Sequence, residues 1–248
     1  MRGFLFWMIF LIGGVRGWGV EEIVLPMRFH LIQGASLTVK GVKMEVWVKP
    51  EDVRTVLLAE INRIWKPAGI RFEVEKVIEE PLLNPANREK IFEQIAGFQR
   101  GDDGGGGGSP FALAGSLFRP EEVNPQVINV YFFPYIGQTL QGVATLGGRR
   151  VLVGVWSDKA SHGKRAPEKT LLTEGEPMVR GSLGRTLGHE LGHALTLVHP
   201  PKDGVDEGGM GRLMGGGKQG YGLTAGEIEQ ARRSAIEHLR GRGKSGGN

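Results

Sequence analysis

The sequence predicts a mixed α/β (α+β) domain, in which a twisted mixed sheet packs against an internal histidine-bearing helix and a C-terminal helix. Three observations support this prediction. Apolar residues recur with the helix period over residues 53–65, and apolar and charged residues alternate over residues 70–75. Residues 127–133 and 150–156 are dense apolar runs typical of buried strands. With 248 residues, 40% of them hydrophobic, the chain can bury one sizeable core.

The predicted elements have recognisable boundaries. Pro50 and the acidic residues after it open the first helix at its positive end, and Pro67 closes it. Thr224 and Glu227 form a capping box that opens the last helix. In chain order, we expect strands at 25–32 and 44–49, a helix at 50–65, strands at 70–75, 127–133 and 150–156, the histidine-bearing helix, and a final helix at 224–239.

Residues 80–125 have the character of an insertion. A helix is expected within 85–98, followed by a flexible loop at Gly104–Gly108. The Asp102-Asp103 pair beside these glycines makes calcium conceivable, but the glycine–aspartate nonapeptide repeat that binds calcium is missing. We therefore interpret this stretch as a linker, and calcium as a possible but unsupported ligand.

The two ends of the chain differ from the domain between them. Residues 1–19 are typical of a signal peptide, because Arg2 precedes an apolar run at Phe4–Val15 and small residues follow. The alternative is an uncleaved membrane anchor, although the run is short for a membrane span. We expect a catalytic domain over residues 20–240 and a disordered tail over residues 241–248.

Composition narrows the functional classes. The chain has no cysteine, which excludes disulfides and thiolate metal ligands, and it has no Asn-x-Ser/Thr sequon. These absences favour a bacterial exported protein, secreted or periplasmic. The net charge of +4 is modest and the basic tail lacks interleaved aromatic residues, so no nucleic-acid partner is expected.

The most informative segment reads HELGHALTLVH and ends at His199. Histidines four residues apart share one helix face, so His189 and His193 can hold one metal ion, and Glu190 can reach a metal-bound water. His199 is a candidate third ligand. The alternative is that these are ordinary polar positions on an amphipathic helix. The apolar stripe on the other side comprises Leu187, Leu191, Ala194, Leu195 and Val198.

This pattern resembles that of the metzincin clan of zinc endopeptidases, in which HExxHxxGxxH is followed by a Met-turn. The resemblance implies a zincin-like α+β fold, one catalytic zinc ion bound by the three histidines, and Glu190 as the general base. It also implies a methionine beneath the metal, for which Met214 is the better candidate and Met210 the poorer one. The implied zinc ligands are His189, His193 and His199.

Weaker similarities extend over roughly residues 24–240. Residues 62–72 look like the first helix and second strand of a metzincin domain. Gly142-Val143-Ala144 resembles the upper rim of the metzincin cleft, where the substrate binds as an extended strand. A plain hairpin turn is the alternative. By the same resemblance, Tyr221 is assigned to the wall of a specificity pocket.

One position departs from the clan's pattern, because Thr196 stands where the clan has glycine. Glycine suits a turn with positive φ, which is costly for a β-branched residue. Either Thr196 adopts an ordinary turn that still presents His199, or the third ligand comes from elsewhere. Asp203 and Asp206 are the nearest substitutes. The spacing, and the Pro200-Pro201 pair directly after it, favour His199.

The resemblance implies a zinc endopeptidase that acts on protein or peptide substrates. With the signal peptide, we expect a secreted monomer with no membrane partner after signal cleavage. Zinc would lower the pKa of a bound water, and Glu190 would take the proton of that water. Two other functions stay open. One is a catalytically inactive binding protein with a zincin fold, and the other is a zinc amidase that acts on cell-wall peptides.

Overall fold

The computed structural model describes residues 21–34, 36–81, 88–96, 111, 117–137, 141–157, 168–170, 182–200, 211–215 and 220–242. Several features predicted from the sequence lie outside these ranges. They are the signal peptide at 1–19, Asp102-Asp103, the loop Gly104–Gly108, Asp203, Asp206, Met210 and the tail beyond residue 242.

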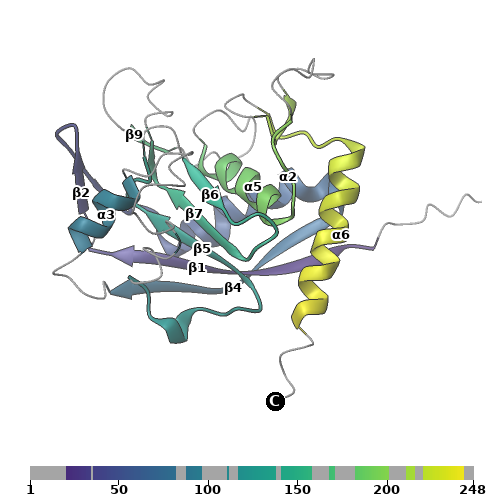
Figure 1. Cartoon of the computed structure of the whole chain (residues 1–248), viewed down its shortest axis with the longest axis horizontal. Coiled ribbons are helices and arrows are strands. Elements are labelled where there is room, and N and C mark those ends of the chain that lie inside the picture. Colours follow the sequence, from purple (N-terminus) through teal and green to yellow (C-terminus); the bar gives the residue numbers. More distant parts are fainter. Residues whose placement is uncertain are drawn as a thin grey trace, which may run out of the picture.

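A five-stranded mixed sheet forms the centre of the fold. Its strands are β1 (Ile23–Gln33), β4 (Ile70–Pro81), β5 (Ile128–Phe133), β6 (Gly142–Ala144) and β7 (Arg150–Gly154). Their order across the sheet is β4-β1-β5-β7-β6 (Figure 1). β1 pairs in parallel with β4 and β5, β5 pairs in parallel with β7, and β6 is antiparallel to β7. The predicted mixed α/β class is therefore confirmed.

The predicted strand at 44–49 is wrong beyond Glu45. β3 (Val42–Glu45) pairs only with β2 (Ser36–Val39), in a separate two-stranded hairpin. The backbone N–H of Lys49 donates to Asp52 Oδ2 at 2.9 Å, which caps the helix that starts at Pro50. Lys49, just before Pro50, is therefore the N-cap of the helix and does not extend the strand.

The predicted first helix is present but irregular. It consists of α1 (Pro50–Asp52), a π-helical turn η1 (Val53–Leu57) and α2 (Leu58–Trp65), followed by the 3-10 turn η2 (Lys66–Ala68). Gly69, with φ +60°, ends it and leads into β4.

The remaining elements are α3 (Arg88–Ala96), η3 (Pro120–Glu122), β8 (Trp156–Ser157), β9 (Glu168–Lys169), α5 (Leu183–Ala194) and α6 (Ala225–Arg242). Within the described ranges, none of the helices combines the length and the apolar character needed to cross a membrane.

Both faces of the sheet carry a hydrophobic core. On one face, Met27 and Phe29 of β1 pack with the buried side chains of α2 and α5, which lie side by side (Figure 1). On the other face, Phe92 of α3 and Phe118 pack against Phe133 of β5. The region predicted as an insertion thus supplies part of the second core, because its apolar side chains cover a sheet face that would otherwise be wet.

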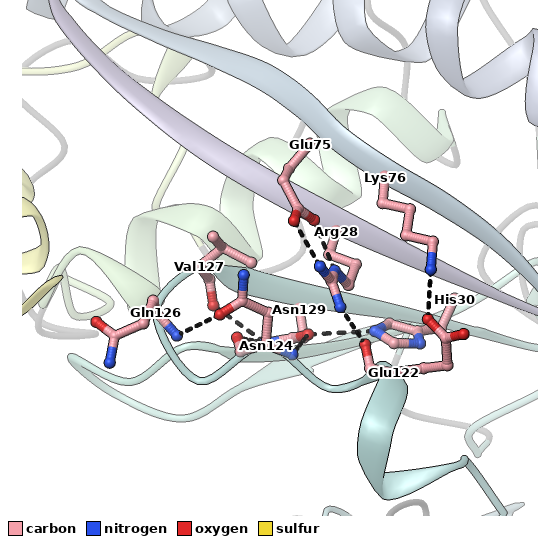
Figure 2. Close-up of polar contacts among 9 residues, drawn as sticks. All are labelled: Arg28, His30, Glu75, Lys76, Glu122, Asn124, Gln126, Val127 and Asn129. Atoms are coloured by element: carbon pink, nitrogen blue, oxygen red, sulfur yellow. Dashed lines mark hydrogen bonds and ion pairs between the residues drawn. The ribbon is translucent and has the colours of Figure 1, made fainter. Parts of the chain in front are cut away.

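A polar network ties strands together on this second face (Figure 2). Arg28 of β1 donates to Glu75 of β4 at 2.6 Å and to the backbone carbonyl of Glu122 at 2.6 Å. The hydrogen bond between the Arg28 and Glu75 side chains raises the pKa of Arg28 and lowers the pKa of Glu75. His30 is fully buried, with Nε2 3.2 Å from Asn129 Oδ1. His30 is therefore a packed residue of this network, in agreement with a structural role.

Glycines allow α5 to approach α2 closely. A Cβ on Gly184 would lie 1.9 Å from Glu60 Oε2 and 2.7 Å from Glu60 Cβ, and a Cβ on Gly188 would lie 2.7 Å from Ile64 Cδ1. Trp65 Nε1 donates to the carbonyl of Gly188 at 3.3 Å. This close contact fixes the position of the histidine-bearing helix on the main core.

Replacing Gly184 with alanine is expected to destabilise the protein by about 1–3 kcal/mol, because the added methyl group overlaps the buried Glu60 side chain. Gly226→Ala is the matched control, since that position on α6 is open and alanine should stabilise the helix by about 0.4–1 kcal/mol. Urea denaturation of both variants measures the effect. A Gly184→Ala variant as stable as the wild type would contradict the close contact.

Candidate metal centre

Helix α5 carries the motif and has a defined start and end. Ser182 is its N-cap, with Oγ accepting from the backbone N–H of Arg185 at 3.4 Å. The helix ends at Ala194, earlier than the predicted apolar stripe requires. Val198 is 58% exposed, so its predicted place in the apolar stripe is wrong. The other stripe residues, Leu187, Leu191, Ala194 and Leu195, are fully buried.

Three histidine side chains converge on one point. His199 Nε2 lies 2.9 Å from His189 Nε2 and 3.2 Å from His193 Nε2. All three ligand atoms lie within 4.8 Å of one another. Within the described ranges, no other group of histidines, aspartates or glutamates has a metal-binding arrangement of this kind. The structure thus brings together the three histidines predicted as ligands.

Backbone carbonyls set the protonation of two of these rings. His189 Nδ1 lies 2.7 Å from the Leu213 carbonyl, and His193 Nδ1 lies 2.7 Å from the Leu197 carbonyl. A carbonyl can only accept, so each Nδ1 carries a hydrogen, and in the neutral form of each ring Nε2 then presents a lone pair. Such a second partner is what orients the histidine ligands of metal sites.

The donor set fits a zinc ion. Two lone pairs face His199 Nε2 at close range, and a single N–H on that ring could satisfy only one of them at a time. Tetrahedral zinc with nitrogen ligands at about 2.0–2.1 Å would place those nitrogens about 3.3 Å apart. Burial lowers the pKa of His189 to about 3, so this ring is neutral at neutral pH and free to bind a cation.

Thr196 contradicts the first alternative proposed from the sequence, whereas the second, a ligand from Asp203 or Asp206, concerns residues outside the described ranges. It does not adopt an ordinary turn, since its φ is +69°, and His199 still reaches the other two histidines. The Thr196 N–H donates to the His193 carbonyl at 2.9 Å, and the Leu197 N–H donates to the Gly192 carbonyl at 2.8 Å. These two bonds form a Schellman motif, which commonly has glycine at the position that Thr196 occupies.

The Glu190 side chain extends from α5 to Gly142 of the edge strand β6. Its side chain is buried, with 6% of its surface exposed. A Cβ on Gly142 of β6 would lie 2.5 Å from Glu190 Cγ and 2.7 Å from Glu190 Oε1. The missing side chain of Gly142 therefore leaves the space that the carboxylate occupies. Val143 and Ala144 continue β6 along the sheet edge.

Met214 packs against α5 at Gly192, in the middle of the motif. It is fully buried, and a Cβ on Gly192 would lie 2.5 Å from its Sδ. Gly192 is thus the position on α5 that allows the methionine to approach the helix. Tyr221 is 41% exposed and follows Gly220, whose carbonyl accepts from Arg185 of α5 at 2.8 Å.

Arg185 is a residue of the centre that sequence reasoning missed. Besides Gly220, its guanidinium contacts the Leu213 carbonyl at 3.3 Å, the same carbonyl that orients His189. Arg185 precedes His189 by four residues, so the helix period could have placed both on one face. Its partners, however, are backbone carbonyls from a segment far along the chain, and no sequence pattern shows them.

His238 of α6 is a packed residue. Its surface is 8% exposed, and burial lowers its pKa, with Arg149 adding to the effect. Arg149 also donates to the backbone carbonyl of His238 at 2.6 Å. These contacts join α6 to the residue that precedes β7.

No protein-family model matches the chain, and no curated protein matches it either. Similar solved structures include an archaemetzincin from Methanopyrus kandleri, at 12% identity and a TM-score of 0.46, covering 86% of this chain and 96% of that one. A zinc-dependent peptidase from Methanocorpusculum labreanum matches at 10% identity and a TM-score of 0.38, covering 83% of this chain and 99% of that one. A chaperone–substrate complex matches at 14% identity and a TM-score of 0.43, covering 91% of this chain and 36% of that one.

Proposed function

We propose that this protein is an exported zinc-dependent peptidase that hydrolyses peptide bonds with Glu190 as its general base. The observation that carries the proposal is the convergence of three histidine Nε2 atoms next to a buried glutamate. Two of these rings are oriented by backbone carbonyls so that their lone pairs face the shared point. A three-histidine set leaves a fourth coordination position for water, as in catalytic zinc sites.

Each residue of the centre has a role in this reaction. His189, His193 and His199 would hold the zinc, which when bound supplies a Lewis acid and lowers the pKa of a bound water. Glu190 accepts the proton of the attacking water and passes it to the nitrogen of the leaving amine. Met214 would form an apolar floor beneath the histidines, a role supported by its burial and its packing against Gly192 of the same helix. No covalent intermediate with the protein is needed.

The edge strand β6 provides a place for the substrate. β6 is the last strand of the described sheet, and it pairs with β7 along one side. An extended peptide can add to the other side of such a strand through backbone hydrogen bonds. Gly142 adjoins Glu190, so a peptide bound along β6 would pass beside the general base. We assign Val143 and Ala144 to the same binding strand, and Tyr221 to the wall of the cleft.

The proposal is tested with the full chain, purified from the exported fraction of its expression host. Elemental mass spectrometry should find about one zinc per chain, and N-terminal sequencing should show cleavage near residue 19. A denatured protein substrate should be cut, a chelator should stop cleavage, and added zinc should restore it. Zinc-loaded protein that cleaves only cell-wall peptides would support an amidase instead. Zinc-loaded protein that cleaves neither substrate would instead support the alternative of a catalytically inactive binding protein.

A further inference from the structure

The turn that carries the third histidine has a conformation that its own sequence disfavours. Within the described ranges, Thr196 and Lys40 are the two non-glycine residues with positive φ. Lys40 lies in the tight turn between β2 and β3, where left-handed residues are common. Thr196 is β-branched, and the left-handed region is costly for such a side chain. A conformation of this kind persists only when the surrounding structure holds it.

Gln230 of α6 holds this turn from a distant part of the chain. Its Nε2 donates to the Thr196 carbonyl at 2.7 Å and lies 3.4 Å from Thr196 Oγ1. The Thr196 hydroxyl in turn donates to the Leu195 carbonyl at 2.6 Å. On the other side, Thr196 Cγ2 would lie 3.2 Å from a Cβ placed on Gly147. The carbonyl, hydroxyl and methyl groups of Thr196 are therefore all engaged.

The conformation of Thr196 decides where two of the histidines point. Leu197, the next residue, accepts through its carbonyl from His193 Nδ1 at 2.7 Å. Its N–H closes the Schellman motif on the Gly192 carbonyl. His199 follows two residues later. If Thr196 moved to ordinary negative φ, the Leu197 carbonyl would leave His193 and the chain would direct His199 away from the other rings.

We propose that Gln230 is a positioning residue for the metal centre, which compensates for the absence of glycine at position 196 by holding Thr196 in the left-handed conformation. This role rests on the proposed zinc function, and it makes α6 part of the metal site although α6 supplies no ligand. The relation predicts a specific compensation between two residues: the amide of Gln230 matters because residue 196 is a threonine, and a glycine there should need it much less.

The decisive measurement is zinc affinity by competition with a chelating dye. Gln230→Ala should bind zinc about tenfold more weakly than the wild type, in the range seen when outer partners of metal ligands are removed. Thr196→Gly added to that variant should return the affinity to within about threefold of the wild type. Gln230→Glu, which keeps the size of the side chain but loses the donor, should resemble Gln230→Ala. Glu229→Ala is the matched control, because Glu229 is exposed on the same helix and its carboxylate pairs with Arg233 of α6.

A second readout needs no metal. In the metal-free protein, Gln230→Ala should speed hydrogen exchange of the Leu197 amide, which donates to Gly192, and Thr196→Gly should slow it again. Equal zinc affinity and equal exchange in Gln230→Ala and the wild type would overturn the positioning role while leaving the zinc function intact. A failure of Thr196→Gly to rescue a weakened Gln230→Ala would also overturn it. Absence of zinc binding in the wild type would instead refute the proposed function, and the exchange measurement would then decide whether Gln230 holds the turn.

Discussion

Replacing Glu190 with glutamine is expected to lower the rate of peptide hydrolysis by about 10²–10⁴-fold while zinc remains bound. Glutamine has the same shape, so it can occupy the space beside Gly142 without a new overlap. Its amide cannot accept the proton of the attacking water. The loss should therefore appear in kcat, with KM and zinc content close to those of the wild type.

The measurement is single-substrate kinetics on zinc-loaded protein, with zinc content determined on the same samples. Glu229→Gln, the same chemical change at an exposed position of α6, is the matched control and should keep wild-type activity. A Glu190→Gln variant that retained a substantial fraction of wild-type kcat, in a preparation free of contaminating peptidases, would remove Glu190 from the role of general base.

Replacing His199 with alanine is expected to weaken zinc binding by more than about 100-fold, because loss of a ligand should exceed the 10–100-fold cost of losing an outer partner. The variant loses the ring whose Nε2 lies 2.9 Å and 3.2 Å from the two other donors. Peptide hydrolysis should fall with zinc occupancy. Elemental mass spectrometry and dye competition measure the affinity, and circular dichroism checks that the metal-free variant is folded.

The neighbouring Val198 provides the control for this variant. Its side chain is 58% exposed, so Val198→Ala changes the same turn without removing a ligand, and it should bind zinc like the wild type. If His199→Ala keeps full zinc affinity, the third ligand lies elsewhere. Asp203 and Asp206 would then be the residues to replace next.

Features that depend on local periodicity could be predicted without the structure. The four-residue spacing of His189 and His193 places both on one face of a helix wherever that helix packs. The alternation over residues 70–75 and the apolar runs around residues 127–133 and 150–156 predicted three strands of the sheet, and each is present. The ends of the elements were less predictable. The strand expected up to residue 49 ends at Glu45, because the residues after it lead into the cap of the next helix.

Contacts between groups that are far apart in the sequence could be established only from the folded chain. The Leu213 carbonyl orients His189 from 24 residues away, and Gly142 makes room for Glu190 from another layer of the fold. Thr196 shows most clearly why local sequence is not enough for this prediction. Its own conformational preference opposes a positive φ, and the hydrogen bond to the turn comes from Gln230, 34 residues later. Contacts of this kind can outweigh local preference because the packed interior excludes water and fixes both partners at once, which no short stretch of sequence does alone.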